Sequence, residues 1–418
     1  MKCQLVTIDL AEPFQPVVVD YGYPNLAVLV CDGGSPLGQL MYQTHDISGF
    51  LLSAERLEAD VVHRFGWEVF TRSKHLRSDV GTLSTDPLPA ITVAICTKDR
   101  PLSLDRCLAA LGRVTYPNFE ILVIDNGSKD PDVQTTAAKH QVRCVVETNV
   151  GLDWARNRAI EDANHHLIAF CDDDVVVSPR WLHGIAKGFL DPRTAMVTGL
   201  VLAAEVDTRW QGEFERYGGM AKGFTPFDIK LDTLPEEEYF TSSRWGVGAN
   251  MAIRRNIAKE VGMFDVGLDV GTPSGGGGDI EMMWRVVSAG HNLRYEPNAW
   301  VRHAHRRDRS SLIRQIHANG RSYGCFLQSV VDRDPAMSKL VRSHARIWMT
   351  QWLARQLVVG VRNRDRFATT LAWAEFRGAM SCRSAYRQTR AIQHSDKPRL
   401  PKRRLFPGIK STGGKKQR

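Results

Sequence analysis

The feature that most constrains the fold is an alternation of apolar and helical segments that begins at residue 88. The apolar segments have the length and residue types of strands, and they are apolar nearly throughout. We expect strands at 91–96, 121–124, 144–146 and 167–170, and helices at 101–111, 131–140 and 154–164. Such strands must be covered on both faces, as in a parallel sheet between helices. The sequence therefore predicts an α/β fold with a doubly wound, mostly parallel sheet.

Polar or charged residues follow each of these strands. In doubly wound sheets, ligands bind beyond the carboxyl ends of the strands, so these residues are the first candidates for a site. They are TKDR at 97–100, DNGS at 125–128, NVG at 149–151 leading into ARN at 155–157, and DDD at 172–174. An Asn-Gly pair such as Asn126-Gly127 is also an ordinary turn. The acidic triplet is therefore the more informative signal.

Asp172, Asp173 and Asp174 come directly after the apolar run at 167–170. Three adjacent carboxylates repel one another unless a cation or several hydrogen-bond donors offset their charge. A hard divalent ion with oxygen ligands is the simplest remedy, and Mg²⁺ or Mn²⁺ bridging phosphate oxygens fits best. The alternative is a solvated acidic loop. No G-x-x-x-x-G-K-[ST] loop is present, and the first strand is followed by TKDR and not by G-x-G-x-x-G, which speaks against P-loop and dinucleotide-binding folds.

Three further segments follow in the second half of the domain. Residues 245–250 (WGVGAN) carry small residues before an expected strand at 251–253, so that the backbone and Asn250 can approach a ligand. Four glycines at 275–278 precede Asp279 and Glu281, where a helix begins; they are either a mobile loop over the site or a flexible linker. His303 and His305 have strand spacing and would share one face of a strand.

Six segments, taken in order, resemble the family 2 glycosyltransferases with the GT-A fold. They are VAICTKDRP, EILVIDNGSKD, NVGLDWARN, IAFCDDDVVVSPRWL, GVGANMAIRR…VGMFD and GGGGDIEMMWRVVSAGHNLRYEPNAWVRH. The resemblance covers about residues 88–306, roughly half of the chain. It implies an inverting transfer of a sugar from a nucleoside-diphosphate sugar such as a UDP-, GDP- or dTDP-sugar. The chain lacks a Q-x-x-R-W motif, so we expect a non-processive enzyme.

The resemblance also implies roles for individual residues. A donor-binding group would consist of Thr97, Asp99, Arg100, Asp125, Arg156, Asn157, Asp172, Asp173 and Asn250. Asp172 and Asp174 take the D-x-D positions as ligands of Mn²⁺ or Mg²⁺, and His303 matches a histidine that often joins the metal or the diphosphate.

One departure concerns the catalytic base. The family usually has Glu-Asp ahead of the helix, whereas this chain has Gly278-Asp279, with Glu281 nearby. Asp279 keeps the position of the base, and Glu281 is the second candidate. The missing acid leaves open a non-catalytic subunit that binds nucleotide sugars. A nucleotidyltransferase, which also combines a doubly wound sheet with acidic metal ligands, is the less favoured alternative.

Around this domain we expect a small α+β domain at 1–87, the glycosyltransferase domain at 88–310, a helical region at 311–395 and a basic, disordered tail at 396–418. The chain carries +9 overall, but the segment 383–418 has twelve Lys or Arg and one Asp, which leaves −2 for the remainder. The tail is either a solvated end or a peripheral contact with an anionic membrane. Nucleic acid ranks last, because the tail lacks interleaved aromatic residues.

The eight cysteines are scattered without a C-x-x-C pair, which fits a reducing compartment. The first residues lack the apolar core of a signal peptide, and no stretch has the ~18 apolar residues of a membrane helix. We therefore expect a cytoplasmic protein, with a glycan, lipid-linked or small-molecule acceptor.

Overall fold

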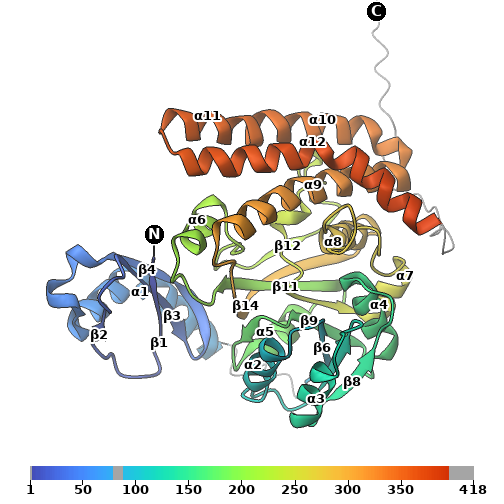
Figure 1. Ribbon diagram of the computed structural model, residues 1–418. Coiled ribbons are helices and arrows are strands. Elements are labelled where there is room, and N and C mark those ends of the chain that lie inside the picture. Colours follow the sequence, from blue (N-terminus) through green and yellow to red (C-terminus); the bar gives the residue numbers. More distant parts are fainter. Residues whose placement is uncertain (1, 79–87, 395–418) are drawn as a thin grey trace, which may run out of the picture.

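A computed structural model of the chain describes residues 2–78 and 88–394. Within these residues, one central sheet of nine strands carries helices on both faces (Figure 1). Its order is β10 (Val175–Val177), β14 (Asn292–His303), β11 (Thr194–Ala203), β13 (Asn250–Arg254), β9 (Leu167–Asp172), β6 (Ile91–Thr97), β7 (Phe119–Asp125) and β8 (Arg143–Val146), with β12 (Phe227–Ile229) also paired to β14.

The sheet is mixed and mostly parallel. β9, β6, β7 and β8 run parallel, and so do β11 and β14, whereas β13 runs antiparallel to both of its neighbours. One face packs against α2 (Pro101–Leu111), α3 (Asp132–Lys139) and α5 (Trp181–Gly188). The other packs against α4 (Leu152–Asp162), α7 (Arg255–Glu260) and α8 (Gly278–Ser288). The predicted α/β fold with a doubly wound, mostly parallel sheet is confirmed.

The strands β6–β9 and the helices between them begin and end within two residues of the positions expected from the sequence. Every strand residue of β6 except the half-buried Cys96 is buried, because residues of alternating orientation face the two helical layers. Asn250 begins β13, so it belongs to the sheet and not to a loop before it. β14 ends at His303, so His305 lies outside the strand.

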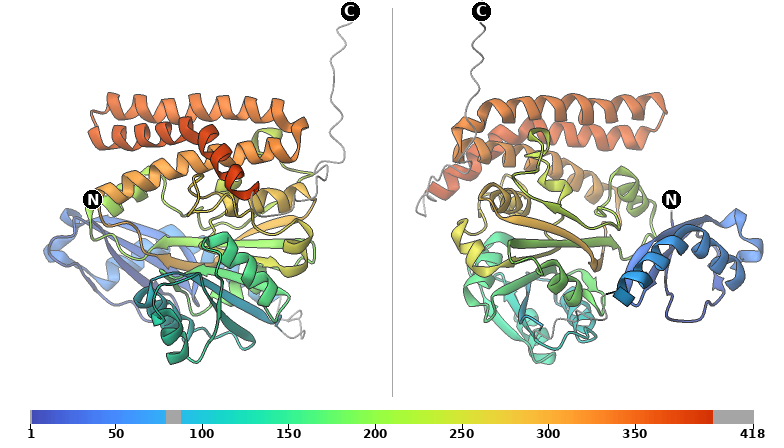
Figure 2. Two further views of the ribbon diagram at one scale, coloured as in Figure 1. Left: turned by 45° about the vertical axis from the view of Figure 1, so that its right-hand side comes forward. Right: turned by 180° about the vertical axis from the view of Figure 1, so that it is seen from behind.

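The N-terminal residues form a smaller unit beside the central sheet (Figures 1 and 2). It contains a three-stranded sheet of β1 (Gln4–Asp9), β3 (Asn25–Asp32) and β4 (Ser35–Gln43), a two-stranded pair of β2 (Val17–Val18) and β5 (Leu51–Leu52), and α1 (Ala54–Ser78). Trp300 of β14 donates its indole N–H to the carbonyl of Gly34 at 3.0 Å. Leu29 and Cys31 of β3 pack on Leu200 of β11. The small unit thus rests on the β11–β14 part of the sheet.

The C-terminal region is helical and lies over the end of the sheet that carries α8 (Figure 2). It consists of α9 (Arg309–Arg333), α10 (Ser338–Ile347), a π-helical turn η7 (Trp348–Ala354), α11 (Arg355–Arg362) and α12 (Arg366–His394). A separate short helix, α6 (Arg209–Tyr217), lies between β11 and β12 in the chain. Phe326 of α9 packs edge-on against Trp284 of α8. α9 and α12 cross closely, because a Cβ on Gly320 would lie 2.2 Å from the carbonyl oxygen of Glu375.

Among the described helices, none combines the length and apolar character that crossing a bilayer requires. The basic segment at 396–418, for which we predict a membrane contact or a solvated end, lies outside the described residues. The division of the chain into four parts at 87, 310 and 395 stays a prediction.

Candidate functional site

The acidic triplet lies at the carboxyl end of β9, beside the last residue of β14. Asp172 ends β9, and Asp173 and Asp174 form the turn into β10. β10 pairs antiparallel with β14 so that Val175 is opposite His303. This register brings the His303 Nε2 to 3.2 Å from Asp174 Oδ1 and 3.8 Å from Asp172 Oδ2.

Asp172, Asp174 and His303 have the geometry of a metal site. One ligand atom from each lies within 4.8 Å of the other two. Asp174 Oδ1 is buried without a hydrogen-bond partner among the described residues, a costly state that a bound cation would relieve. Burial lowers the pKa of His303, which favours the neutral imidazole that ligates metals. Two carboxylates and one imidazole are suitable ligands for Mn²⁺, and the carboxylate oxygens are suitable ligands for Mg²⁺.

Asp173 points the other way and ties the strand ends together. Thr97 at the end of β6 donates to Asp173 Oδ2 at 2.6 Å, and Arg100 donates to Asp173 Oδ1 at 2.6 Å and to Asp174 Oδ2 at 3.2 Å. Burial raises the pKa of Asp173 to about 6, with the hydrogen bond from Thr97 and the charge of Arg100 opposing it. Thr97 and Arg100 therefore hold in place the turn of Asp173 and Asp174, which we call the metal turn.

The remaining predicted donor residues follow β6 and β7. Asp125 is buried, and its carboxylate accepts hydrogen bonds from the Ser128 amide at 3.0 Å and from Gln134 at 3.1 Å. Asp99 adopts a positive φ of 54° and accepts from the Lys129 amide at 2.8 Å. The structure thus brings Thr97, Asp99 and Asp125 to one edge of the sheet, as predicted, with Asp125 shaping the turn that follows β7.

Arg156 lies between the metal turn and the amino end of α8. It is buried on α4, and its guanidinium donates to Asp153 Oδ1 at 3.0 Å. Burial alone would lower its pKa, but the charges of Asp153, Asp172 and Asp279 outweigh this and raise it. Arg156 is therefore a permanent cation among three carboxylates.

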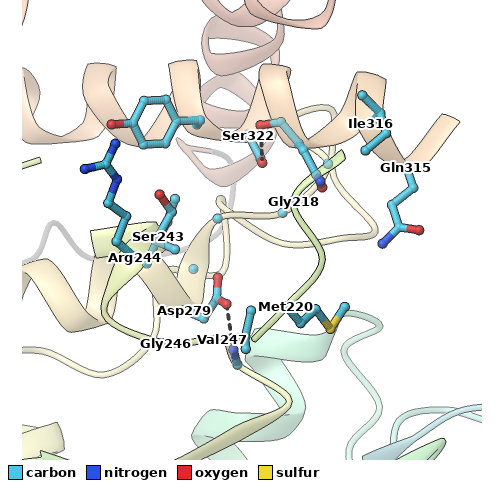
Figure 3. Close-up of a pocket in the computed structure, with 18 of the residues that line it drawn as sticks. Gly218, Met220, Ser243, Arg244, Gly246, Val247, Asp279, Gln315, Ile316 and Ser322 are labelled. Carbon is cyan, nitrogen blue, oxygen red and sulfur yellow. Dashed lines mark hydrogen bonds between the residues drawn. The ribbon is translucent and has the colours of Figure 1, made fainter. Parts of the chain in front are cut away.

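Asp279 stands in the first turn of α8 and accepts a hydrogen bond from the Gly248 amide at 2.9 Å (Figure 3). It lines one large cavity that also reaches Asp172 and Arg156. The carboxylate of Asp153 on α4 occupies the space beside Gly278, where the family resemblance predicts an acid. A Cβ on Gly278 would lie 1.8 Å from Asp153 Oδ2. Burial raises the pKa of Asp153. Sequence reasoning missed Asp153, although its spacing of three residues from Arg156 on a helix was a signal.

The structure places Glu281, the second candidate for the base, outside the cavity. Glu281 is fully buried and points away from the cavity. Both of its carboxylate oxygens accept from Arg285 at 2.8 Å, and Arg333 of α9 lies 2.7 Å from Oε1. Asp279 and Glu281 are two residues apart, so they face different sides of α8. Glu281 joins α8 to α9 and does not reach the site.

Asn157 and Asn250, which are predicted to bind the sugar donor, and His305 make contacts that stabilise the fold. Asn157 exchanges hydrogen bonds with the backbone of Phe264, at 2.7 and 3.0 Å. Asn250 is fully buried, accepts from Trp181 at 2.9 Å and donates to the carbonyl of Ala299 at 2.7 Å. These contacts use their side chains, so neither points into the site. His305 lies 2.6 Å from Glu215.

The glycine-rich segment before α8 is held in place on both sides. Ser274 is buried, its amide donates to Thr389 of α12 at 3.2 Å, and its carbonyl accepts from Arg321 of α9 at 3.3 Å. Gly277 has a φ of 109°, in the left-handed region, and precedes α8. In this structure the segment is a packed connection between the C-terminal helices and Asp279, and not an unattached linker.

Comparison with known proteins agrees with this geometry. Residues 92–262 match the model of the family described as Glycosyl transferase family 2. The chain is 25% identical over 222 residues to the pre-mycofactocin glycosyltransferase of Mycobacterium tuberculosis, which is 52% of this chain and 43% of that protein. It is 26% identical over 219 residues to the glycosyltransferase AglE of Haloferax volcanii, 50% of this chain and 66% of that protein. The chain thus spans less than two thirds of either relative.

Among solved structures, the chain is similar to the mannosyltransferase PcManGT from Pyrobaculum calidifontis in complex with GDP-Man and Mn²⁺. The TM-score is 0.49 at 15% identity, over 78% of this chain and 96% of that one. The match of residues 92–262, set on a sheet whose strand ends gather the acidic triplet, His303 and Asp279, identifies the chain as carrying a family 2 glycosyltransferase domain.

Proposed function

We propose that this protein is a metal-dependent, inverting glycosyltransferase that moves one sugar per encounter from a nucleoside-diphosphate sugar to an acceptor hydroxyl. The observation that supports this most is the shared cavity. Asp172, which forms a candidate metal site with Asp174 and His303, lines one end of the cavity, and Asp279 lines the same cavity. Donor and acceptor chemistry can therefore meet in one place.

The donor end must neutralise the charge that grows on the leaving diphosphate. When bound by Asp172, Asp174 and His303, a divalent ion supplies Lewis-acid stabilisation of that charge. Arg100 and Asp173 keep the ligand turn fixed through contacts of 2.6 Å. Arg156 adds a buried positive charge between this turn and Asp279. A fixed cation in a dry cleft stabilises developing negative charge without reorganising solvent.

The acceptor end must remove a proton as the hydroxyl oxygen attacks C1 of the sugar. Asp279 is positioned for this, because its carboxylate is oriented by the Gly248 amide at 2.9 Å. The new bond joins the acceptor oxygen to C1, the bond from C1 to the diphosphate oxygen breaks, and the proton passes to Asp279. Attack from the face opposite the leaving group inverts the anomeric centre.

The products of the reaction test this proposal. Incubation with UDP-, GDP- or dTDP-sugars and Mn²⁺ is expected to release a nucleoside diphosphate, and the transferred sugar should have the inverted anomeric configuration. A nucleotidyltransferase would instead release no nucleoside diphosphate from these donors, and it would release pyrophosphate when given a nucleoside triphosphate and a sugar 1-phosphate. Donor binding without any release would identify a non-catalytic subunit, which the carboxylate of Asp153 beside Gly278 makes the weaker alternative.

A further inference from the structure

The cavity that holds Asp279 continues beyond it into the C-terminal helices. Its volume is about 870 Å³, and it extends from Asp172 to Trp348 and Arg355. Figure 3 shows Ser243 and Arg244 on one side of this space and Gln315 and Ser322 of α9 on the other. One wall of the part beyond Asp279 thus belongs to residues 92–262, the segment that matches the family, and the opposite wall is formed by the C-terminal helices, which lie outside that segment.

Three cationic side chains line this outer part, and only one carboxyl group accompanies them. The cations are Lys222, Arg244 and Arg355, and the carboxyl group is Glu375. Within residues 2–78 and 88–394, none of the three cations has an ion pair or a side-chain hydrogen bond. Glu375 accepts from Tyr217 at 2.6 Å, and burial raises its pKa. The outer cavity is thus positively charged.

Of the three outer cations, Lys222 interacts electrostatically with both the proposed base and Arg244. Burial lowers the pKa of Lys222, the charge of Asp279 opposes this, and the charge of Arg244 adds to it. The loop of Lys222 is held by Tyr295, whose hydroxyl donates to the Gly223 carbonyl at 2.7 Å. Arg244 ends the 3-10 turn Ser242–Arg244, and the next residue, Trp245, is buried. Two neighbouring cations that repel each other on anchored backbone gain from an anion between them.

The rest of the outer wall has side chains suited to a sugar ring. Trp348 lies edge-on to Tyr323, with ring centroids 4.7 Å apart. Trp348 and Gln351 belong to the π-helical turn, a geometry that is frequent at functional sites because it changes the direction of side chains along a helix. Aromatic faces pack against the C–H face of a sugar ring, and amides such as Gln315 bond its hydroxyls.

We propose that the acceptor is an anionic carbohydrate, whose carboxylate or phosphate lies between Lys222 and Arg244 while its hydroxyl faces Asp279. This rests on the proposed glycosyl transfer for the role of Asp279, but the charge preference can be measured without turnover. The competing use of these cations is to hold the diphosphate of the donor, which would place the anion on the other substrate.

Ligand-observed NMR with three probes tests the charge preference: methyl β-D-glucuronide, glucose 6-phosphate and the neutral methyl β-D-glucoside. We expect at least one acidic probe to bind about ten-fold more tightly than the neutral one, the effect of a charge-assisted contact. The two acidic probes distinguish a carboxylate from a phosphate. The preference should weaken with added salt.

The variants Lys222→Met and Arg244→Met should each remove most of this preference, whereas Lys259→Met, at an exposed position on α7, should keep it. Affinity for the donor nucleotide, measured in the same samples with Mn²⁺, should change less than two-fold. Equal affinity for all three probes, or loss of nucleotide affinity in both cavity variants, would overturn the proposal. Failure of the wild-type protein to bind any nucleotide sugar would instead count against the proposed function.

Discussion

Asp153 Oδ2 lies where a side chain on Gly278 would begin, 1.8 Å from the position of a Cβ on that residue. The resemblance to family 2 enzymes predicts an acid before the proposed base, whereas α8 has Gly278 there, and a carboxylate from α4 occupies the adjacent space. Asp153 Oδ1 accepts from Arg156 at 3.0 Å, while Oδ2 is buried without a hydrogen-bond partner in the described residues. Asp153 therefore positions Arg156 beside Asp279.

An exchange of the two positions tests this relationship. Gly278→Glu should lower turnover about ten-fold or more, because its side chain displaces Asp153 from Arg156, and Asp153→Ala should lower it because Arg156 loses its partner. The double variant Asp153→Ala/Gly278→Glu should recover much of the activity, since the carboxylate returns from α8. The measurement is kcat and KM for the donor in all four proteins, read as a double-mutant cycle.

Gly271→Ala provides the matched control for this exchange, because a Cβ there has no atom within 4 Å. It should behave as the wild type. Strictly additive losses in the double variant would show that Asp153 does not stand in for the missing acid.

Asp279→Asn should abolish transfer and spare donor binding. The amide keeps the shape of the carboxylate but cannot accept the acceptor's proton. A loss in kcat of at least 10²-fold is expected from removal of a general base. Nucleotide affinity by titration calorimetry provides the comparison, and an equally large loss there would mean that Asp279 serves structure or donor binding.

Glu281→Gln should destabilise the protein without acting on the chemical step. Glu281 joins Arg285 and Arg333 in a buried network, so its neutralisation leaves two arginines under-compensated. The expected cost is about 3–5 kcal/mol, as for breaking a buried ion pair. Denaturant unfolding beside the Asp279→Asn protein measures it. Wild-type stability with lost turnover would restore Glu281 as a candidate base.

The contact between Asp265 and Arg390 should make stability depend on pH. Burial alone would raise the pKa of Asp265, but the hydrogen bonds and charge of Arg390 and the charge of Arg333 hold it well below the usual range. Because the pKa of Asp265 is lower in the folded protein than the unfolded value of ~3.9, its ionised carboxylate stabilises the fold at pH values above ~3.9. This stabilisation is lost as the pH falls below that value.

Arg390→Met should therefore cost about 1.5–3 kcal/mol at pH 7, the weight of hydrogen bonds to a charged group. The difference from wild type should shrink as the pH falls below about 4. Unfolding free energies from denaturant titrations at pH 7, 5 and 3 give the comparison. A difference that stays constant over this range would show that the charge of Asp265 is not what Arg390 stabilises.

The first half of the glycosyltransferase domain could be predicted from local patterns. The strands β6, β7, β8 and β9 are short apolar runs bounded by polar turns, and their parallel pairing follows from the helices between them. The convergence of Asp172, Asp174 and His303 was predictable once the strand ends and the resemblance were combined. Their roles as ligands stay predictions.

The predicted site residues whose side chains the structure directs elsewhere are held by contacts between distant segments. Asn250 looked like a ligand residue after a glycine-rich stretch, but its amide bonds Ala299 and Trp181 across the sheet. Glu281 looked like a spare acid until Arg333 of α9 came to lie beside it. Asp153 and Gly278 are 125 positions apart in the chain, yet a Cβ on Gly278 would lie 1.8 Å from Asp153 Oδ2. No periodicity along the chain predicts this proximity.

The most direct test of the account is the metal dependence of transfer. Protein treated with EDTA should release no nucleoside diphosphate from a donor sugar, and Mn²⁺ or Mg²⁺ should restore release. Asp174→Ala and His303→Ala should bind Mn²⁺ at least ten-fold more weakly by electron paramagnetic resonance, since each removes one ligand of the predicted site. Full turnover in EDTA, or near-normal turnover of Asp174→Ala, would contradict the metal site and with it the proposed mechanism.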